Sequence, residues 1–101
     1  VNVCVTYGGR AEIMRAARGW AEDGFAGMEE GFSSKLYSSG IPDPDLIIRP
    51  GGERRLSNFL LWQAAYAVLY FTDTLWPDFT TADLDAAIDQ FDRRTRRFGG
   101  I

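Results

Sequence analysis

Histidine is missing from the 101-residue chain, and cysteine occurs only once, as Cys4. Without histidine, catalytic triads built on imidazole and zinc sites with histidine ligands are excluded, so a metal would need oxygen ligands. A single cysteine cannot form a disulfide within the chain, and its position among the valines of residues 1–5 predicts an inert thiol in the core. This cysteine usage fits a reducing, cytoplasmic setting.

Long hydrophobic runs are also missing. Without a signal peptide or an apolar stretch of about 18 residues, the chain is not expected to span a membrane by itself, although peripheral contact stays open. With 46% hydrophobic and 25% charged residues, the chain is an ordinary globular sequence of one domain at most. The net charge of −3 argues against a nucleic-acid binder. Arginines cluster at residues 49–55 and 93–97, which suits a small anionic ligand.

Hydrophobic periodicity predicts an α/β fold with a mostly parallel sheet flanked by helices. We expect strands at residues 1–5, at residues 46–48, and at the end of the apolar run 59–71, which should begin as a short buried helix. Helices are expected from about Arg10 to Gly24, around residues 34–37, and after a cap formed by Thr80 and Asp83. The crossover between the first two strands predicts their parallel pairing. Three strands leave sheet surface uncovered, so further sheet should come from another segment or a partner.

The polar run after the strand at residues 46–48 reads Arg-Pro-Gly-Gly-Glu-Arg-Arg-Leu-Ser-Asn. Parallel sheets bind ligands at this end of a strand. Gly51 and Gly52 permit positive φ, so that their N–H groups could converge on an anion, and the arginines offer planar forks for phosphate oxygens. Glu53 can orient an arginine, and Ser57 adds a hydroxyl donor. The run matches neither a Walker loop nor the dinucleotide fingerprint, and a solvated turn is the alternative to a diphosphate site.

These motifs and their order resemble the C-terminal portion of the cis-prenyltransferases, the undecaprenyl diphosphate synthase family. The resemblance covers essentially all of residues 1–101, somewhat under half of a complete family domain. The matching segments are Tyr-Gly-Gly-Arg at 7–10, Pro-Asp-Pro-Asp-Leu-Ile-Ile-Arg at 42–49, Glu-Arg-Arg-Leu-Ser-Asn-Phe-Leu-Leu-Trp-Gln at 53–63, Tyr-Phe-Thr-Asp at 70–73, Leu-Trp-Pro-Asp-Phe at 75–79 and Arg-Arg-Phe-Gly-Gly at 96–100.

The resemblance implies an α/β homodimer that uses Mg²⁺ to condense isopentenyl diphosphate with an allylic prenyl diphosphate, giving a cis-polyprenyl diphosphate. By this resemblance Arg49, Arg55 and Ser57 would bind the isopentenyl diphosphate, and the Arg-Phe-Gly element at 97–99 would reach across the dimer. The family's metal-binding aspartate precedes this segment, so no catalytic residue is expected within it, and the segment alone should be inactive. The expected diphosphate-binding set is Arg49, Gly51, Gly52, Glu53, Arg55, Ser57, Arg97 and Gly99.

Two positions depart from the family pattern. Val68 stands where the family usually has a glutamate that helps to hold Mg²⁺, and an aliphatic side chain cannot ligate a hard cation. Pro50 replaces a more usual threonine and removes one N–H donor. Two alternatives therefore stay open: an enzyme for short-chain or irregular prenyl coupling, and a non-catalytic diphosphate-binding subunit of a prenyltransferase complex. Product length and the choice of allylic substrate do not follow from this sequence.

Overall fold

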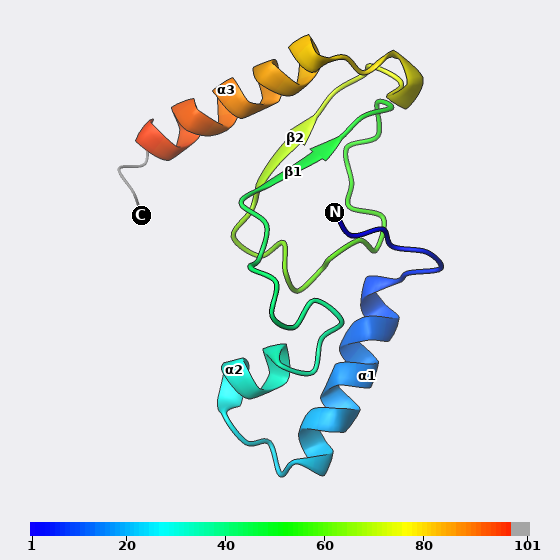
Figure 1. Cartoon of the computed structure of the whole chain (residues 1–101), viewed down its shortest axis with the longest axis vertical. Helices are drawn as coiled ribbons and strands as arrows, with labels where there is room; N and C mark the ends of the chain where they lie inside the picture. The colour runs from blue at the N-terminus through cyan, green and yellow to red at the C-terminus, as the bar shows by residue number, and fades with distance from the viewer. Residues whose placement is uncertain (98–101) are drawn as a thin grey trace. The chain divides into compact units, whose positions relative to one another are not determined.

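The computed structural model describes residues 1–97, and for residues 96 and 97 it describes the backbone alone. This part of the chain forms two compact units, the first made of Val1–Asp43 and Leu56–Ala65, the second of Pro44–Arg55 and the chain from Tyr66 onward. The elements in chain order are α1 (Gly9–Glu22), α2 (Met28–Ser33), β1 (Leu46–Arg49), β2 (Val68–Phe71), the 3₁₀ turn η1 (Trp76–Asp78) and α3 (Thr81–Arg97) (Figure 1). Helices and a parallel sheet confirm the predicted α/β class.

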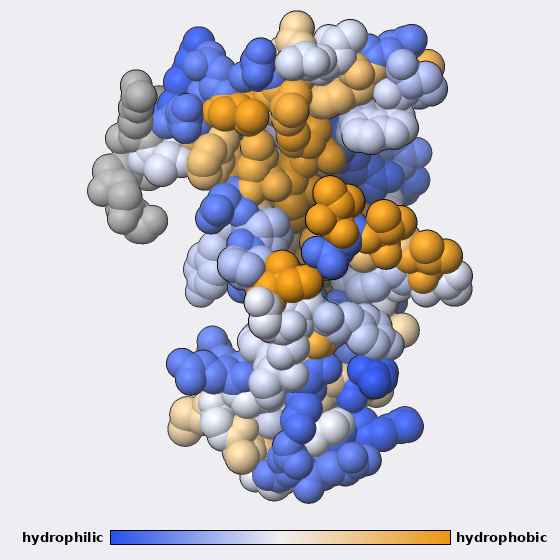
Figure 2. All heavy atoms as spheres, viewed as in Figure 1, coloured by the Kyte–Doolittle hydropathy of each residue, from blue (hydrophilic) through white to orange (hydrophobic). Residues whose placement is uncertain are grey.

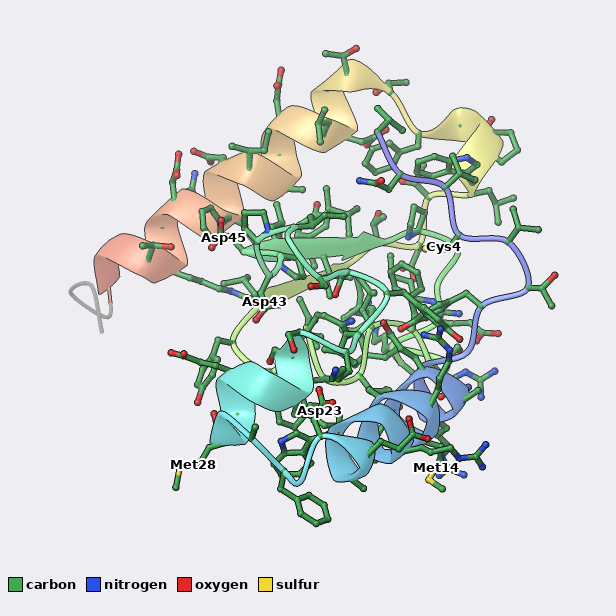
Figure 3. The ribbon with its side chains drawn as sticks, turned by 60° about the horizontal axis from the view of Figure 1, so that its bottom comes forward. Cys4, Met14, Asp23, Met28, Asp43 and Asp45 are labelled. Carbon is green, nitrogen blue, oxygen red and sulfur yellow. The ribbon has the colours of Figure 1, made fainter. Side chains whose placement is uncertain are left out.

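Helix α1 confirms the helix predicted from about residue 10, and α2 packs beside it in the first unit. The apolar stripe of α1 buries Ala16 and brings Ile13, Ala17 and Trp20 partly into a small core with Phe32 and Leu36. Met14 and Met28 point away from the ribbon, as Figure 3 shows. The helical period of α1 therefore identified its core face correctly.

Helix α2 lies earlier in the chain than the short helix predicted at residues 34–37, and that prediction is wrong. The helix begins after Gly27, whose φ of 78° ends the preceding turn. Lys35 and Leu36 continue from α2 in single turns, with N–H groups donating three residues back to Phe32 and Ser33. Phe32, buried at the end of α2, packs its ring 4.5 Å from that of Trp62. Phe32 thus places the end of α2 in the core of the first unit.

A buried carboxylate that the sequence did not reveal ties the first unit together. Glu12, 2% exposed on α1, accepts hydrogen bonds from the hydroxyl of Tyr7, from Nε2 of Gln63 at 3.1 Å and 3.2 Å, and from the N–H of Tyr37 at 2.8 Å. Gln63 Nε2 also donates to Ser38 Oγ at 2.9 Å. A buried charge is tolerated when several donors surround it, and these donors come from segments far apart in the sequence.

The strand predicted at residues 1–5 does not form in the described structure, and that prediction is wrong. Val1, Val3 and Val5 are exposed, and Figure 2 shows hydrophobic side chains standing out along the N-terminal segment. Cys4 is an exposed free thiol, so its predicted burial is also wrong. A strand needs a neighbouring backbone to pair with, and the partner predicted for this segment, β1, pairs with β2 instead.

The second unit contains the sheet. Strands β1 and β2 are parallel and half-buried, with Leu46 opposite Val68 and Arg49 opposite Phe71. Both strands were predicted, but their pairing with each other was not. Helix α3 contacts β1 and buries Ala87 completely, whereas Leu84 and Ile88 stay 40% and 44% exposed.

The apolar run before β2 was predicted to begin as a short buried helix, and this prediction is wrong. Residues 57–66 form consecutive turns that bury Gln63 and Ala64. Ser57, Asn58 and Leu60 have φ of 51°, 65° and 47°, in the left-handed region that an α-helix cannot contain. Among residues 1–97, no helix is both long and apolar enough to cross a membrane.

Candidate diphosphate site

The glycines after β1 shape the loop through their conformation. Gly51 and Gly52 have φ of 95° and 82°, which glycine adopts without steric cost. Gly51 N–H donates to the carbonyl of Thr74, and Gly52 N–H to that of Thr72, both at 2.9 Å. These bonds fold the loop back onto the segment that follows β2. Both N–H groups thus already donate to carbonyls of the protein. The sequence predicted instead that these N–H groups would be free to donate to an anion.

Arg49 and Arg55 are brought together by Glu53, which the sequence predicted could orient an arginine. Oε2 of Glu53 lies 2.7 Å from Nε of Arg55 and 3.6 Å from Nη2 of Arg49. Arg49 also donates from Nη1 to the carbonyl of Arg55 at 2.6 Å. One carboxylate therefore holds two guanidinium groups at the carboxyl end of β1. We call the residues Arg49, Glu53 and Arg55 the arginine cradle.

The electrostatics of the arginine cradle favour an anion. The hydrogen bond from Arg55 is the main cause that lowers the pKa of Glu53, with further lowering by the charges of Arg55 and Arg49. Two positive charges and one negative charge leave a local excess of one positive charge. Arg55 contacts Glu53 through Nε, and its side chain is 71% exposed. The outer edge of its guanidinium can therefore donate to two oxygens of a phosphate group.

The neighbouring arginine plays a different part. Arg54 lies 3.9 Å from Asp73, and both side chains are largely exposed, so this ion pair contributes little to stability. Arg54 takes no part in the hydrogen bonds among Arg49, Glu53 and Arg55. The structure thus distinguishes two adjacent arginines that a motif search treats alike.

Ser57 belongs to the first unit, where it is exposed at the start of the turns that follow the arginine cradle in the sequence. Its neighbour Asn58 is the residue that sequence reasoning missed: Asn58 Oδ1 accepts the N–H of Arg10 at 2.9 Å, and its carbonyl accepts the N–H of Gly9 at 2.6 Å. The signal was present as an asparagine after a serine, because asparagine commonly caps helices and tolerates positive φ.

The remaining predicted residues are less defined. Arg97 is the last residue of α3, but its side chain and Gly99 both lie outside the described residues. Val68 begins β2 and is half-buried opposite Leu46. Within residues 1–97 no three side chains of aspartate, glutamate, histidine or cysteine come together as metal ligands. Asp43, Asp45, Asp73 and Asp78 belong to no such cluster within these residues.

Comparisons with known proteins identify the family. The family described as "Putative undecaprenyl diphosphate synthase" matches residues 1–99. The chain is 52% identical to an isoprenyl transferase of Fusobacterium nucleatum over its whole length, which is 44% of that protein. It is 54% identical to an isoprenyl transferase of Brucella abortus, of which it covers 42%. The chain thus spans less than half the length of these relatives.

Solved structures agree with the sequence matches. A probable undecaprenyl diphosphate synthase from Campylobacter jejuni superposes with a TM-score of 0.77 at 42% identity, over 94% of this chain and 45% of the other. Lavandulyl diphosphate synthase from Lavandula x intermedia, solved in complex with dimethylallyl diphosphate, gives 0.76 at 43% identity, over 86% of this chain and 41% of the other. The family match over nearly the whole chain and the shared fold show that this chain belongs to the undecaprenyl diphosphate synthase family.

Proposed function

We propose that the protein containing this chain condenses isopentenyl diphosphate with an allylic prenyl diphosphate to give a cis-polyprenyl diphosphate. The observation that carries the proposal is the arginine cradle, in which Glu53 holds Arg49 and Arg55 at the carboxyl end of a parallel strand. Membership of the family supports the same reaction, because the curated relatives are isoprenyl transferases.

In this reaction the C–O bond of the allylic diphosphate breaks and inorganic diphosphate leaves. The alkene of isopentenyl diphosphate attacks the resulting allylic carbon, a new C–C bond forms, and a proton is lost from the isopentenyl unit. The proposed part of this chain is to bind the isopentenyl diphosphate through Arg49 and Arg55, with Ser57 as a further donor. Fixing the diphosphate orients the alkene for attack, which lowers the entropic part of the barrier.

Further parts of the proposal concern the whole protein. Mg²⁺ would assist the departure of the diphosphate. A homodimer, in which Arg97 and Gly99 approach the neighbouring site, follows from the family resemblance. A cytoplasmic location with peripheral membrane contact fits a water-soluble substrate and a long apolar product. A dimer would show in analytical ultracentrifugation, and membrane contact in flotation with phospholipid vesicles.

The decisive experiment uses the full-length protein and two adjacent substitutions that remove the same charge. Arg55→Ala should raise KM for isopentenyl diphosphate about 10- to 100-fold, the size expected for loss of a charged donor to a phosphate. Arg54→Ala is the matched control, since its side chain pairs only weakly with exposed Asp73. Equal effects of both substitutions, or no condensation of labelled isopentenyl diphosphate by the unmodified protein, would contradict the proposal.

A second comparison tests the alternatives left open by Val68. The unmodified protein and its Val68→Glu variant are assayed with Mg²⁺, labelled isopentenyl diphosphate and short allylic diphosphates. We expect cis-elongated product from the unmodified protein. Product that appears only after glutamate is introduced would indicate a non-catalytic subunit, and coupling of two five-carbon allylic diphosphates would indicate an irregular prenyl-coupling enzyme.

A further inference from the structure

We infer that Asn58 is a positioning residue that holds Ser57 in place by docking its turn onto the N-terminus of helix α1. This inference rests on the proposed function, because Ser57 matters there as a donor to the diphosphate. Asn58 follows Ser57 directly in the sequence. All of its contacts used below lie within the first unit.

The start of helix α1 lacks a cap from its own chain neighbour. The N-cap residue Gly8 has no side chain, and the first N–H groups of a helix have no partner inside it. Asn58 supplies acceptors for two of these groups: its carbonyl accepts the N–H of Gly9, and its Oδ1 accepts the N–H of Arg10. A residue 48 positions away in the sequence therefore caps this helix.

Asn58 approaches the N-terminus of α1 so closely that glycine is required at Gly9. A Cβ on Gly9 would lie 2.8 Å from the carbonyl oxygen of Asn58, and one on Gly8 would lie 3.0 Å from its Nδ2. A Cβ essentially never shows a contact as short as the one at Gly9, where it would meet the backbone of Asn58, whereas the contact at Gly8 is tight but involves the end of a side chain that can shift. Gly8, Gly9 and Asn58 therefore pack closely against one another.

The backbone at this contact adopts an unfavourable conformation, which the contact can stabilise. Ser57 and Asn58 both have positive φ, and for serine this conformation is unfavourable without support from its surroundings. The two hydrogen bonds from α1 hold Asn58 in the left-handed region. Ser57 directly precedes Asn58. The contact between Asn58 and α1 therefore also restricts the backbone of Ser57 and the direction of its hydroxyl.

A second attachment holds the same segment further along. Gln63 is 3% exposed and donates from Nε2 to Glu12, a residue of the first turn of α1. The turns from Ser57 to Gln63 are thus fastened to one end of one helix at two points. Loss of the Asn58 contact would free the end that carries Ser57 and leave the Gln63 end attached.

The test breaks the contact from either side in the full-length protein. Asn58→Gly keeps the positive φ but removes the side-chain acceptor, whereas Asn58→Asp keeps an oxygen acceptor near a helix N-terminus. Arg10→Pro removes the donor N–H at a position of the first helical turn where proline is tolerated. Arg10→Ala is its matched control, since it loses the same side chain but retains the N–H group.

Calorimetric titration with isopentenyl diphosphate alone measures binding without turnover, and hydrogen exchange reports on the N–H of Arg10. We expect Asn58→Gly and Arg10→Pro each to weaken binding about 5- to 10-fold, the size of one lost cap. Asn58→Asp and Arg10→Ala should bind nearly as the unmodified protein does. Exchange at Arg10 should become faster in Asn58→Gly and stay slow in Asn58→Asp.

Several outcomes would overturn the inference. Unchanged binding by Asn58→Gly would show that the dock does not position Ser57, and unchanged exchange at Arg10 would show that the contact is absent in solution. Ser34→Ala removes a 2.7 Å bond from Ser34 Oγ to the carbonyl of Gly31 in the same unit, so an equal loss of binding there would point to general destabilisation. If the unmodified protein does not bind isopentenyl diphosphate, the proposed function fails and the positioning role falls with it, whereas the exchange rates separately report whether the cap exists.

Discussion

Arg55 donates its Nε–H to Oε2 of Glu53 across 2.7 Å, so this carboxylate sets the direction of the guanidinium before any anion binds. The same bond is the main reason that the pKa of Glu53 lies below its ordinary value of 4.5. The ionised carboxylate is therefore retained to lower pH in the folded protein than in the unfolded chain.

A depressed pKa in the folded state means that the interaction is present above the unfolded value and is lost as pH falls through the folded value. We predict that the side-chain carboxyl carbon of Glu53, followed by NMR, titrates with a midpoint below 4.5. In an Arg55→Ala variant the midpoint should move up toward 4.5, because the main cause is removed. A midpoint that is the same in both proteins would show that the pair does not form in solution.

Tyr7 should make the folded protein less stable at alkaline pH. Burial, followed by its hydrogen bond to Glu12, raises the pKa of the Tyr7 hydroxyl far above its ordinary value of 10.0. A raised pKa gives stability that is fully present below the unfolded value and is lost as pH rises toward the folded value. We predict that the free energy of unfolding falls as pH rises above 10, and that Tyr7→Phe makes this fall less steep. Urea unfolding of both proteins at pH 8 to 11 is the measurement, and equal slopes would contradict the prediction.

The two loop glycines should respond alike to alanine. Both have positive φ, so either substitution should destabilise the protein by about 1–2 kcal/mol through backbone strain. A Cβ on Gly51 meets no atom within 4 Å, and one on Gly52 lies at ordinary contact distance, 3.4 Å, from Oδ1 of Asp73. Steric overlap therefore adds nothing to the strain at either position. Urea unfolding of the two variants is the measurement, and a clearly larger loss for Gly52→Ala than for Gly51→Ala would contradict the prediction.

Helix α3 should depend on its capping box. Thr80 N–H and Oγ1 both donate to Oδ2 of Asp83, at 2.7 Å and 2.9 Å, as the sequence predicted. Thr80→Ala and Asp83→Ala should each destabilise the protein by about 1 kcal/mol, and the double variant by less than their sum, because they break one shared motif. Additive losses in a double-mutant cycle would show that the two residues act independently.

Local patterns predicted much of this structure. The 3.6-residue period found α1 and its face, the Thr80–Asp83 motif found the start of α3, and short β-branched runs found β1 and β2. That Glu53 orients an arginine also followed from residue types alone, whereas its contact with both Arg49 and Arg55 was not predicted. Features that depend on neighbours in sequence were therefore predictable.

The wrong predictions share a non-local cause. The valines of residues 1–5 have strand propensity, but a strand also needs an adjacent backbone, which they lack among the described residues. The helix expected from residue 59 is interrupted by positive φ at Leu60, in a segment that contacts α1 through Asn58. Burial of Glu12 depends on donors from Tyr7, Tyr37 and Gln63, and no single window of sequence contains them all.

The exposed valines of residues 1–5 affect which molecule can be used to measure assembly. These residues have strand propensity but belong to no sheet of the described structure, and the sequence spans less than half the length of its relatives. A fragment limited to residues 1–101 would expose these apolar side chains and could associate through them. The oligomeric state of that fragment would therefore not report on the proposed homodimer, which has to be measured on the full-length protein.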